Sequence, residues 1–249
     1  KKGKKQAGLG AFFKPAAGAK PKAKPTAKAE AAPAPASSAS SSSVTYPHEA
    51  LPLVGVQFGI GAEHDGEGRS ITLLYEHFSV VALYVPNSGQ KLERLDYRVE
   101  EWDPALRAYV KGLETTHDTP AFVLGDLNVA HEDVDCYNWW APHLKKQPGC
   151  TARERESHSA WLASGYKDAL RTIHGSACKG QYTYWSTRAV TARSENKGLR
   201  LDAFICSEST LPEAEEGHTV VRVVDSYVIP ATTKTSDHAP IALHLGLRI

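Results

Sequence analysis

From about residue 51 onward, short apolar runs alternate with amphipathic stretches, and this pattern is the strongest constraint on the fold of the chain. Runs rich in β-branched and aromatic residues predict strands at 70–75, 78–85, 121–124, 199–206 and 239–245. Glu76 and His77 separate the first two runs, which fits a hairpin. Because strands and helices alternate without a strict βαβ rhythm, the pattern predicts a layered α/β sandwich.

Two stretches have the spacing of a helix. Over 91–114, apolar residues recur every three or four positions. Asp103 and Pro104 interrupt this stretch, so we expect a kink there, or a cap with proline at the first position of a new turn. Residues 155–173 predict a second helix.

The first 43 residues differ in composition from the rest of the chain. They hold nine lysines and one acidic residue, a net charge of +8, whereas the remaining 20 basic and 27 acidic residues give −7. Residues 14–43 are rich in Lys, Ala, Pro and Ser and lack the apolar content to form a core. We therefore predict a disordered basic tail over 1–43, which would favour a polyanion or an acidic protein as its partner, and a folded domain over 44–249.

Other features of the composition exclude several classes of protein. The four cysteines show no C-x-x-C spacing, so we expect reduced, partly buried thiols and neither a zinc site nor a set of disulfides. No apolar run approaches the length of a membrane span, so we expect no membrane partner. We expect a monomer.

Polar residues cluster at the ends of the predicted strands, in the segments 84–87, 125–128, 200–202 and 236–238. Asp126 and Asn128 are two residues apart and can point the same way, and a carboxylate beside an amide suits a hydrated cation such as Mg²⁺. Asp237 and His238 add a second carboxylate and an imidazole that can stabilise a phosphate oxygen. Each Asp alone could merely cap a turn, but the set as a whole favours metal-assisted hydrolysis of a phosphodiester.

The chain resembles the exonuclease III type apurinic/apyrimidinic (AP) endonucleases. The matching stretches occur in the family's order between residues 51 and 246, at 59–69, 84–98, 125–132, 192–202 and 236–241. The resemblance implies the four-layer α/β/β/α sandwich of the endonuclease/exonuclease/phosphatase superfamily. It also implies an enzyme of base-excision repair that uses Mg²⁺, with Mn²⁺ as the alternative ion. Its substrate would be double-stranded DNA with abasic sites, cleaved 5′ to the lesion, with 3′ phosphodiesterase or exonuclease activity as a further capacity.

The resemblance implies catalytic roles for five residues. Tyr84 would lie against the scissile phosphate, Asp126 would activate the attacking water, and Asn128 would help to stabilise the pentacovalent phosphate. His238 would contact the phosphate while Asp202 orients it. The implied metal ligands are Asp126, Asn128, Asp237 and His238.

The resemblance also implies contacts with DNA. Asn87, Asn138 and Asn196 would hold the backbone, while Arg94 and Arg193 would reach phosphates. Tyr184 would wall the pocket for the extruded abasic sugar. Leu199 replaces a tryptophan of the family and Ala203 an aromatic residue, and we expect both changes to remove aromatic surface near that sugar.

Two motifs that open the family's domain do not occur in this sequence: Trp-Asn-x-Asn-Gly-Leu-Arg and Leu-Gln-Glu-Thr-Lys. The Glu of the second motif is a principal metal ligand of the family. We therefore expect residues 44–249 to form the C-terminal two thirds of the catalytic domain, without its first strands, and to cleave little DNA alone. A partial sequence is our first explanation, ahead of a splice variant and a degenerate paralogue.

The tail carries a motif of its own, which fits the Gln-x-x-aliphatic-x-x-aromatic-aromatic pattern of proteins that bind the sliding clamp, proliferating cell nuclear antigen. One helical turn would bring Leu9, Phe12 and Phe13 together as an apolar plug, with Gln6 in an adjacent polar pocket. Clamp binding places the protein in the nucleus. The alternative is that the segment belongs to a transit peptide, which would place the protein in an organelle.

Two other functions stay open on the sequence alone. One is a superfamily relative with a different phosphate substrate, such as a phosphatase or a deadenylase. The other is a catalytically inactive protein that binds the clamp or DNA, which the missing motifs favour.

Overall fold

The computed structural model describes residues 51–61, 63–212, 220–229 and 236–248. The tail, with the residues predicted to bind the clamp (Gln6, Leu9, Phe12 and Phe13), lies outside the described residues. Every described residue belongs to one unit, residues 48–249. Within these ranges, no helix is both long and apolar enough to cross a membrane.

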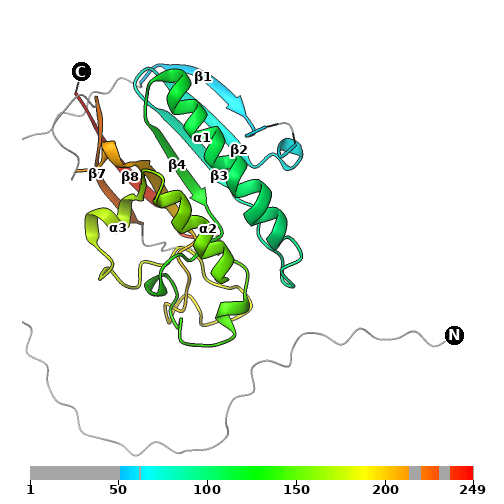
Figure 1. The fold of residues 1–249 in the computed structure, drawn as a ribbon. Helices are drawn as coiled ribbons and strands as arrows, with labels where there is room; N and C mark the ends of the chain where they lie inside the picture. Colours follow the sequence, from blue (N-terminus) through cyan, green and yellow to red (C-terminus); the bar gives the residue numbers. More distant parts are fainter. Residues whose placement is uncertain (1–50, 62, 213–219, 230–235, 249) are drawn as a thin grey trace, which may run out of the picture. The chain divides into compact units, whose positions relative to one another are not determined.

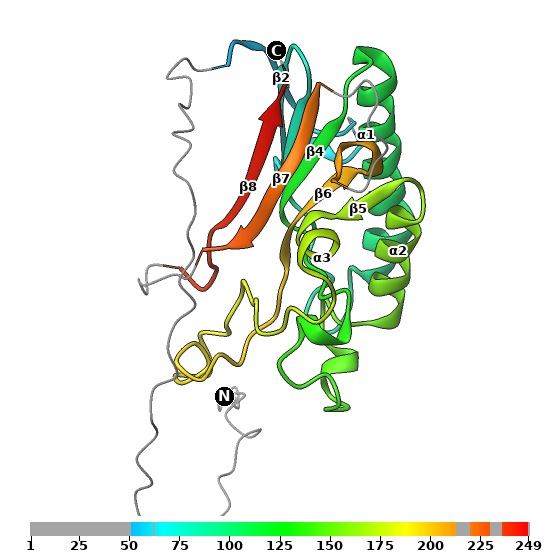
Figure 2. The same ribbon diagram turned by 90° about the vertical axis from the view of Figure 1, so that its left-hand side faces the viewer.

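Two sheets form the centre of the fold (Figures 1 and 2). The larger sheet has the strand order β1-β2-β3-β4-β6-β5, and β7 and β8 form the smaller one. β3 and β4 are parallel, whereas the other pairs are antiparallel. The strands are β1 Leu53–Phe58, β2 Ser70–Tyr75, β3 Ser79–Tyr84, β4 Ala121–Asp126, β5 Tyr166–Asp168, β6 Asp202–Ser207, β7 Val221–Val228 and β8 Ile241–Leu247.

Helices cover one face of the larger sheet, and the β7–β8 sheet lies on the other (Figure 2). The helices are α1 Asp103–His117, α2 Ala152–Leu162 and α3 Ala169–His174, and a π-helical turn, η2 Tyr97–Trp102, leads into α1. Short 3₁₀ turns lie at Asp65–Glu67, Asp133–Asp135, Leu144–Lys146 and Glu208–Thr210. α3 packs beside β7 and β6. The mixed sheet with helices confirms the predicted α/β class.

Two apolar cores hold these layers together. Trp102, Leu106 and Val110 pack from the helices onto Val81 and Val123 of the sheet, and all five are almost completely buried. The second core lies between the two sheets and includes the three phenylalanines Phe78, Phe122 and Phe204 together with Val221 and Val223. Because successive side chains of a strand point to opposite faces, each central strand contributes to both cores.

Several predicted elements agree with the structure. The hairpin is formed by β2 and β3, and the four cysteines are free thiols, of which only Cys178 is not buried. The helix predicted over 91–114 starts as a π-helical turn and becomes α-helical at Asp103, with Pro104 in its first turn. The interruption predicted at Asp103 and Pro104 is therefore a change of helix type.

The single helix predicted over 155–173 is wrong. α2 ends at Leu162, β5 follows, and α3 begins at Ala169. Gly165 adopts a φ of 98°, a left-handed backbone that interrupts a helix, and Asp168 caps α3 by accepting a hydrogen bond from the backbone N–H of Arg171 at 3.2 Å. Both helices and β5 bury apolar residues. The apolar spacing over 155–173 therefore did not distinguish one continuous helix from these three elements.

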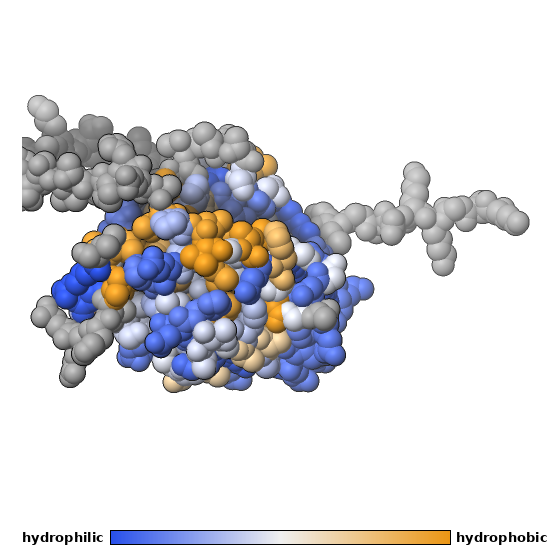
Figure 3. Space-filling model, turned by 90° about the horizontal axis from the view of Figure 1, so that it is seen from above, coloured by the Kyte–Doolittle hydropathy of each residue, from blue (hydrophilic) through white to orange (hydrophobic). Residues whose placement is uncertain are grey.

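The outer part of the larger sheet exposes apolar side chains. The β7–β8 sheet packs against β4 and β6, so that Val56, Phe58 and Ile71 on the same face of β1 and β2 stay exposed. Phe58 leaves 76% of its surface uncovered. Figure 3 shows apolar side chains gathered into one patch on the face seen from above. β1 itself contains no charged residue, unlike most edge strands.

Candidate active site

The register of the larger sheet brings the predicted catalytic residues together. Tyr84 at the end of β3 pairs with Asp126 at the end of β4, and Asp126 pairs with Asp202 at the start of β6. Residues directly opposite each other on neighbouring strands point to the same face, so these three side chains form a row facing the β7–β8 side. His238 joins the row, because its Nδ1 lies 2.7 Å from Asp202 Oδ2.

Asn128 fixes the carboxylate of Asp126. Its backbone N–H donates to Asp126 Oδ1 at 2.9 Å, and its Nδ2 donates to Asp126 Oδ2 at 3.2 Å and to the carbonyl of Val85 at 2.8 Å. Its Oδ1 accepts a hydrogen bond from Asn87 Nδ2 at 2.9 Å. Asn128 holds a left-handed φ of 49°, which asparagine tolerates better than most residues. Asn87 and Asn128, both predicted site residues, therefore act here on Asp126.

The environment of Asp126 favours a proton on its carboxyl group. Burial, followed by the charge of Asp202, raises the pKa of Asp126 to about 6. The hydrogen bond from the N–H of Asn128 and the charge of His238 act in the opposite direction without cancelling the effect. A carboxyl group with such a pKa can accept a proton from water near neutral pH.

His238 is held in place by Asp202. Burial alone would lower the pKa of His238, but the hydrogen bond to Asp202 and the charge of that carboxylate raise it above the usual value. Thr183 in turn fixes Asp202, because its Oγ1 accepts the backbone N–H of Leu201 at 2.9 Å and that of Asp202 at 3.0 Å. With Nδ1 bound to Asp202, Nε2 is the ring nitrogen that can face a ligand.

Tyr184 stands beside His238 as predicted for a pocket wall. Their ring centroids are 5.1 Å apart, and Tyr184 forms backbone bridges with both His238 and Leu199. Leu199 therefore belongs to the same wall. Ala203 does not, because it follows Asp202 on a strand and packs into the core beneath the helices. The expectation that Ala203 removes aromatic surface near the sugar is wrong.

Arg98 supports the two loops that carry the site, although no role was predicted for it from the sequence. Its guanidinium donates to the carbonyls of Leu127 at 2.8 Å, Pro86 at 3.0 Å and Asn128 at 3.4 Å, and pairs with Asp103 at 2.8 Å. Only 3% of Arg98 is exposed. One buried cation thus ties the loop after β3 to the loop after β4.

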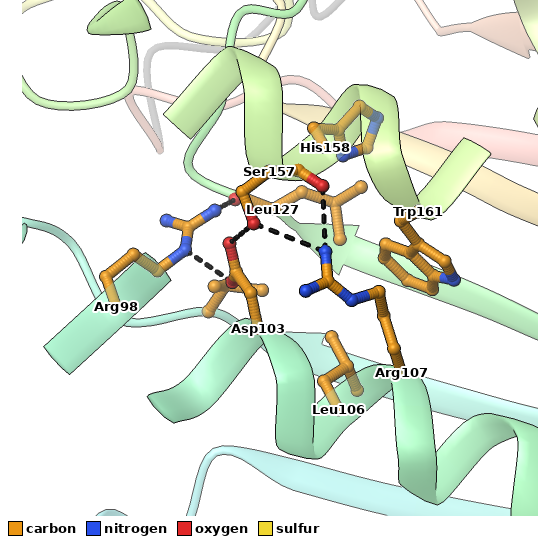
Figure 4. Close-up of a pocket in the computed structure, with 9 residues that line it drawn as sticks. Arg98, Asp103, Leu106, Arg107, Leu127, Ser157, His158 and Trp161 are labelled. Atoms are coloured by element: carbon orange, nitrogen blue, oxygen red, sulfur yellow. Dashed lines mark hydrogen bonds and ion pairs between the residues drawn. The ribbon is translucent and has the colours of Figure 1, made fainter. Parts of the chain in front are cut away.

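A second set of groups secures Asp103 (Figure 4). Ser157 Oγ donates to Asp103 Oδ2 at 2.7 Å, and Arg107 donates to the carbonyl of Ser157 at 2.9 Å. Figure 4 shows these groups, together with Trp161, around a cavity of about 10 Å³, which is the space of about one water molecule. These polar contacts join α1 to α2 on the helix-covered side of the larger sheet.

A buried network of four charged residues holds the segment that leads into β6. Arg200 pairs with Asp135 at 2.7 Å and with Asp168 at 2.6 Å, and Arg171 also contacts Asp135. Burial would raise the pKa of Asp135, but Arg200 and Arg171 lower it to about 2. Arg200 is two residues before Asp202, so the network positions the start of β6.

Two residues predicted to bind DNA hold the site loops instead of pointing freely to solvent. Arg193 donates to the carbonyls of Ser236 and His238, and its guanidinium stacks over the ring of Trp185 at 4.7 Å. Asn196 accepts a hydrogen bond from Trp185 Nε1 at 3.2 Å. Arg193 therefore fixes the loop that carries His238.

The other predicted DNA contacts lie on the rim of the site. Arg94 pairs with Glu67 at 2.6 Å, and Glu67 also pairs with Arg69. Arg69 stacks on the ring of Tyr84 at 4.9 Å, while Tyr84 stays half exposed. Asn138 has a buried Oδ1 without a hydrogen-bond partner in the described part of the chain.

The predicted metal ligands do not form a complete cation site by themselves. Within the described ranges, no three His, Cys, Asp or Glu side chains are arranged to hold a metal ion. Asp126 lies beside Asp202, but Asp202 binds His238 Nδ1, and the amide of Asn128 is engaged with protein atoms. The predicted ligand set, Asp126, Asn128, Asp237 and His238, needs further ligands to hold a metal ion.

Comparisons with known proteins match most of the chain to one family. Residues 50–238 match the Endonuclease/Exonuclease/phosphatase family. The chain is 41% identical over 198 residues to a DNA-(apurinic or apyrimidinic site) endonuclease of Dictyostelium discoideum, covering 77% of this chain and 50% of that protein. It is 38% identical over 193 residues to an exodeoxyribonuclease of Bacillus subtilis, covering 77% and 70%.

Solved structures give the same result. An AP endonuclease from Leishmania major superposes with a TM-score of 0.62 and 30% identity, covering 77% of this chain and 57% of that one. An AP endonuclease from Archaeoglobus fulgidus gives a TM-score of 0.62 and 28% identity, covering 80% and 72%. The chain spans about half the length of the Dictyostelium relative. From its fold, its row of site residues and these matches, the chain belongs to the endonuclease/exonuclease/phosphatase family, with AP endonucleases and exonucleases of the exonuclease III type as its relatives.

Proposed function

We propose that this chain carries most of the catalytic domain of a class II AP endonuclease of base-excision repair. The observation that carries the proposal is the row of Tyr84, Asp126 and Asp202 on three adjacent strands, with His238 2.7 Å from Asp202. A carboxyl group that can take a proton therefore stands beside an imidazole that can hold a phosphate oxygen. The names of the relatives support DNA with an abasic site as the substrate.

The proposed reaction is hydrolysis of the phosphodiester 5′ to the abasic site. Asp126 accepts a proton from water, whose oxygen attacks phosphorus while the bond to the 3′ oxygen breaks, and the leaving 3′ oxygen takes up a proton from solvent water. The products are a 3′-hydroxyl and a 5′-deoxyribose phosphate. His238, whose raised pKa beside Asp202 favours the cationic imidazolium, stabilises the negative charge that develops on the phosphate oxygens. Tyr84, half exposed at the end of β3, can donate a hydrogen bond to the same phosphate.

AP endonucleases of this family generally depend on a divalent metal ion. We propose Mg²⁺, with Mn²⁺ as a substitute, because the carboxylates of Asp126 and Asp237, both in the predicted ligand set, are hard oxygen ligands. When bound, such an ion neutralises charge on the phosphate. The described residues supply only part of its coordination, so phosphate oxygens, water or protein groups outside the described ranges must complete it.

We propose three further properties that rest on the sequence. The tail binds the sliding clamp, proliferating cell nuclear antigen, through Gln6, Leu9, Phe12 and Phe13. The protein acts in the nucleus, and as a monomer. Loss of clamp binding by peptide 1–18 in a Phe12→Ala/Phe13→Ala variant tests the first property, and equal binding of both peptides contradicts it.

A second candidate function is a DNA-binding protein without nuclease activity. The incomplete set of metal ligands among the described residues favours it. It differs from the first proposal in one measurable respect, because such a protein binds abasic DNA but does not cut it.

The test is incision of a duplex that carries one tetrahydrofuran abasic analogue, in Mg²⁺ and in EDTA. Asp126→Asn removes the proposed base, and Asp96→Asn is the matched control, since Asp96 is an exposed carboxylate paired with Arg153 away from the site. Because the described residues supply only part of the metal site, we expect weak nicking 5′ to the analogue in Mg²⁺, which persists in Asp96→Asn and is lost in Asp126→Asn. Binding without nicking by the unmodified chain would support the second candidate instead.

A further inference from the structure

Trp140 lies on a loop beside the site and exposes 78% of its surface. Trp102 and Trp161, in contrast, are 1% and 5% exposed. A single exposed apolar residue needs no explanation by itself. The position of this loop, its anchoring to the domain and its charge indicate a binding role for Trp140.

The loop is connected to the site wall through the backbone. Cys136 bridges to Leu199, Leu199 bridges to Tyr184, and Tyr184 bridges to His238. Tyr137 N–H also donates to the carbonyl beside Leu199, that of Gly198, at 3.1 Å. Three bridges of about 4.8 Å each place Cys136 roughly 15 Å from His238.

A DNA strand advances about 3.4 Å per nucleotide along the duplex axis, so roughly 15 Å corresponds to only a few nucleotides. A duplex bound at His238 is therefore long enough to reach this loop. Figures 1 and 2 show the loops that follow β4 and those that precede β6 at the same end of the molecule, where β4 ends. Trp140 follows Cys136 by four residues. It is thus on the end of the domain that carries the site.

The loop is rigid. Leu144 is 4% exposed and packs with Cys136 and Cys150, and the backbone N–H of Ala141 closes a turn with the carbonyl of Asn138 at 2.8 Å. An aromatic ring on a fixed loop loses little conformational entropy when it binds a ligand.

The loop is also positively charged on an otherwise acidic domain. Residues 136–148 contain Lys145 and Lys146 and no acidic residue, whereas residues 44–249 carry −7 in total. The neighbouring ring of Trp139 already packs against cations, with Arg155 Cζ at 3.8 Å and Lys145 Nζ at 5.1 Å from its centroid. Local positive charge beside an exposed indole is the combination that binds nucleic acid, since phosphates meet the cations and a base stacks on the ring.

We propose that Trp140 stacks on a base of the DNA bound at the site, while Lys145 and Lys146 contact the adjacent phosphates. An abasic site leaves neighbouring bases without a stacking or pairing partner, so that one of their faces is open to the indole. Trp140 is a positioning residue that increases the preference for abasic over intact duplex. The inference rests on the proposed function, because it takes abasic DNA as the ligand.

Binding of fluorescein-labelled duplexes, with and without a tetrahydrofuran analogue, tests the proposal by anisotropy in EDTA. We expect Trp140→Ala to weaken binding of the abasic duplex about tenfold, the effect typical of one stacked base, and binding of the intact duplex less. Trp140→Phe keeps a ring and should bind nearly as the unmodified chain does. Val224→Ala is the control, because Val224 is a 60% exposed apolar residue on β7.

Indole emission gives a second readout. The difference between the spectra of the unmodified chain and Trp140→Phe reports Trp140, and we expect abasic DNA to quench it. Suppose that the unmodified chain prefers abasic duplex, that Trp140→Ala binds it equally well, and that DNA does not quench Trp140 emission. This combination would overturn the role of Trp140 alone. No preference for abasic duplex in the unmodified chain would overturn the proposed function and this inference together.

Discussion

Arg98 offers the sharpest test of how the site is held together. Its guanidinium satisfies the carbonyls of three loop residues and the carboxylate of Asp103, all in a place where only 3% of the arginine is exposed. Arg98→Met keeps most of the length and apolar volume of the side chain but removes every donor. The three carbonyls and Asp103 would then be buried without a cationic partner.

The size of the stability loss in Arg98→Met follows from the contacts of the arginine. Removing one partner of a buried ion pair costs about 3–5 kcal/mol, because the remaining charge stays desolvated. Asp103 is 13% exposed and keeps its bond to Ser157, so its penalty falls toward the lower end of that range. The unsatisfied carbonyls add to it, each by about 1 kcal/mol or more. We expect Arg98→Met to lower the free energy of unfolding by about 6 kcal/mol, which is as large as the whole stability of many domains, about 5–15 kcal/mol.

Urea unfolding followed by tryptophan emission measures this change, since Trp102 and Trp161 are buried near Arg98. Arg153→Met is the matched control, because Arg153 also forms two ion pairs, with Asp96 and Glu100, but on the surface. We expect almost no effect from the control. We reason that burial of Arg98, and not the number of its partners, determines its contribution to the free energy of unfolding. Equal urea midpoints for the two variants would refute this reasoning.

Three further predictions follow from other contacts. The lowered pKa of Asp135 stabilises the fold above the ordinary pKa of 3.8, and this contribution, about 2 kcal/mol, should be lost as pH falls from about 4 to 2; urea midpoints across that range should fall more in the unmodified chain than in Asp135→Asn. Thr183→Val removes the acceptor for two backbone N–H groups and should reduce nicking through kcat more than through KM, which steady-state assays measure. Val54→Lys/Phe58→Lys should reduce binding of the dye ANS and raise the concentration at which light scattering detects aggregates, with little change in the urea midpoint.

The sequence was sufficient to locate the candidate site because strand ends are easy to recognise. Tyr84 and Asp126 each end an apolar run and Asp202 begins one, and once the strands pair, the register places the three side by side. The hairpin and the helix interrupted at Pro104 were also predictable, since both depend on contacts between residues near each other in the chain. These features need only local pattern and the period of a strand.

The supporting residues were not predictable, because their partners are distant in the sequence. Arg98 binds Leu127 29 residues away, and in the helical pattern it occupied an ordinary polar position. The wrong prediction for Ala203 had a local cause, since strict alternation along β6 would have placed it opposite to Asp202. β1 and β7 escaped detection because the first includes Gly55 and lies at an edge, and the second carries polar residues and a bulge near Val224.

The charges of the site imply that cation and DNA bind together. Asp126 and Asp202 face each other across two paired strands, and His238 is the cation that contacts Asp202. In the proposed function, a DNA phosphate adds a further negative charge to this row, and the ionised carboxylate of Asp126 repels it. A divalent cation would remove that repulsion, and each ligand should then increase the affinity for the other by the same factor. Asp126→Asn removes the repulsion without a cation. We therefore expect this variant to bind abasic duplex more tightly than the unmodified chain in EDTA, and to gain less affinity when Ca²⁺ is added. A variant that binds more weakly in EDTA would show that Asp126 attracts the substrate through hydrogen bonds more than its charge repels it.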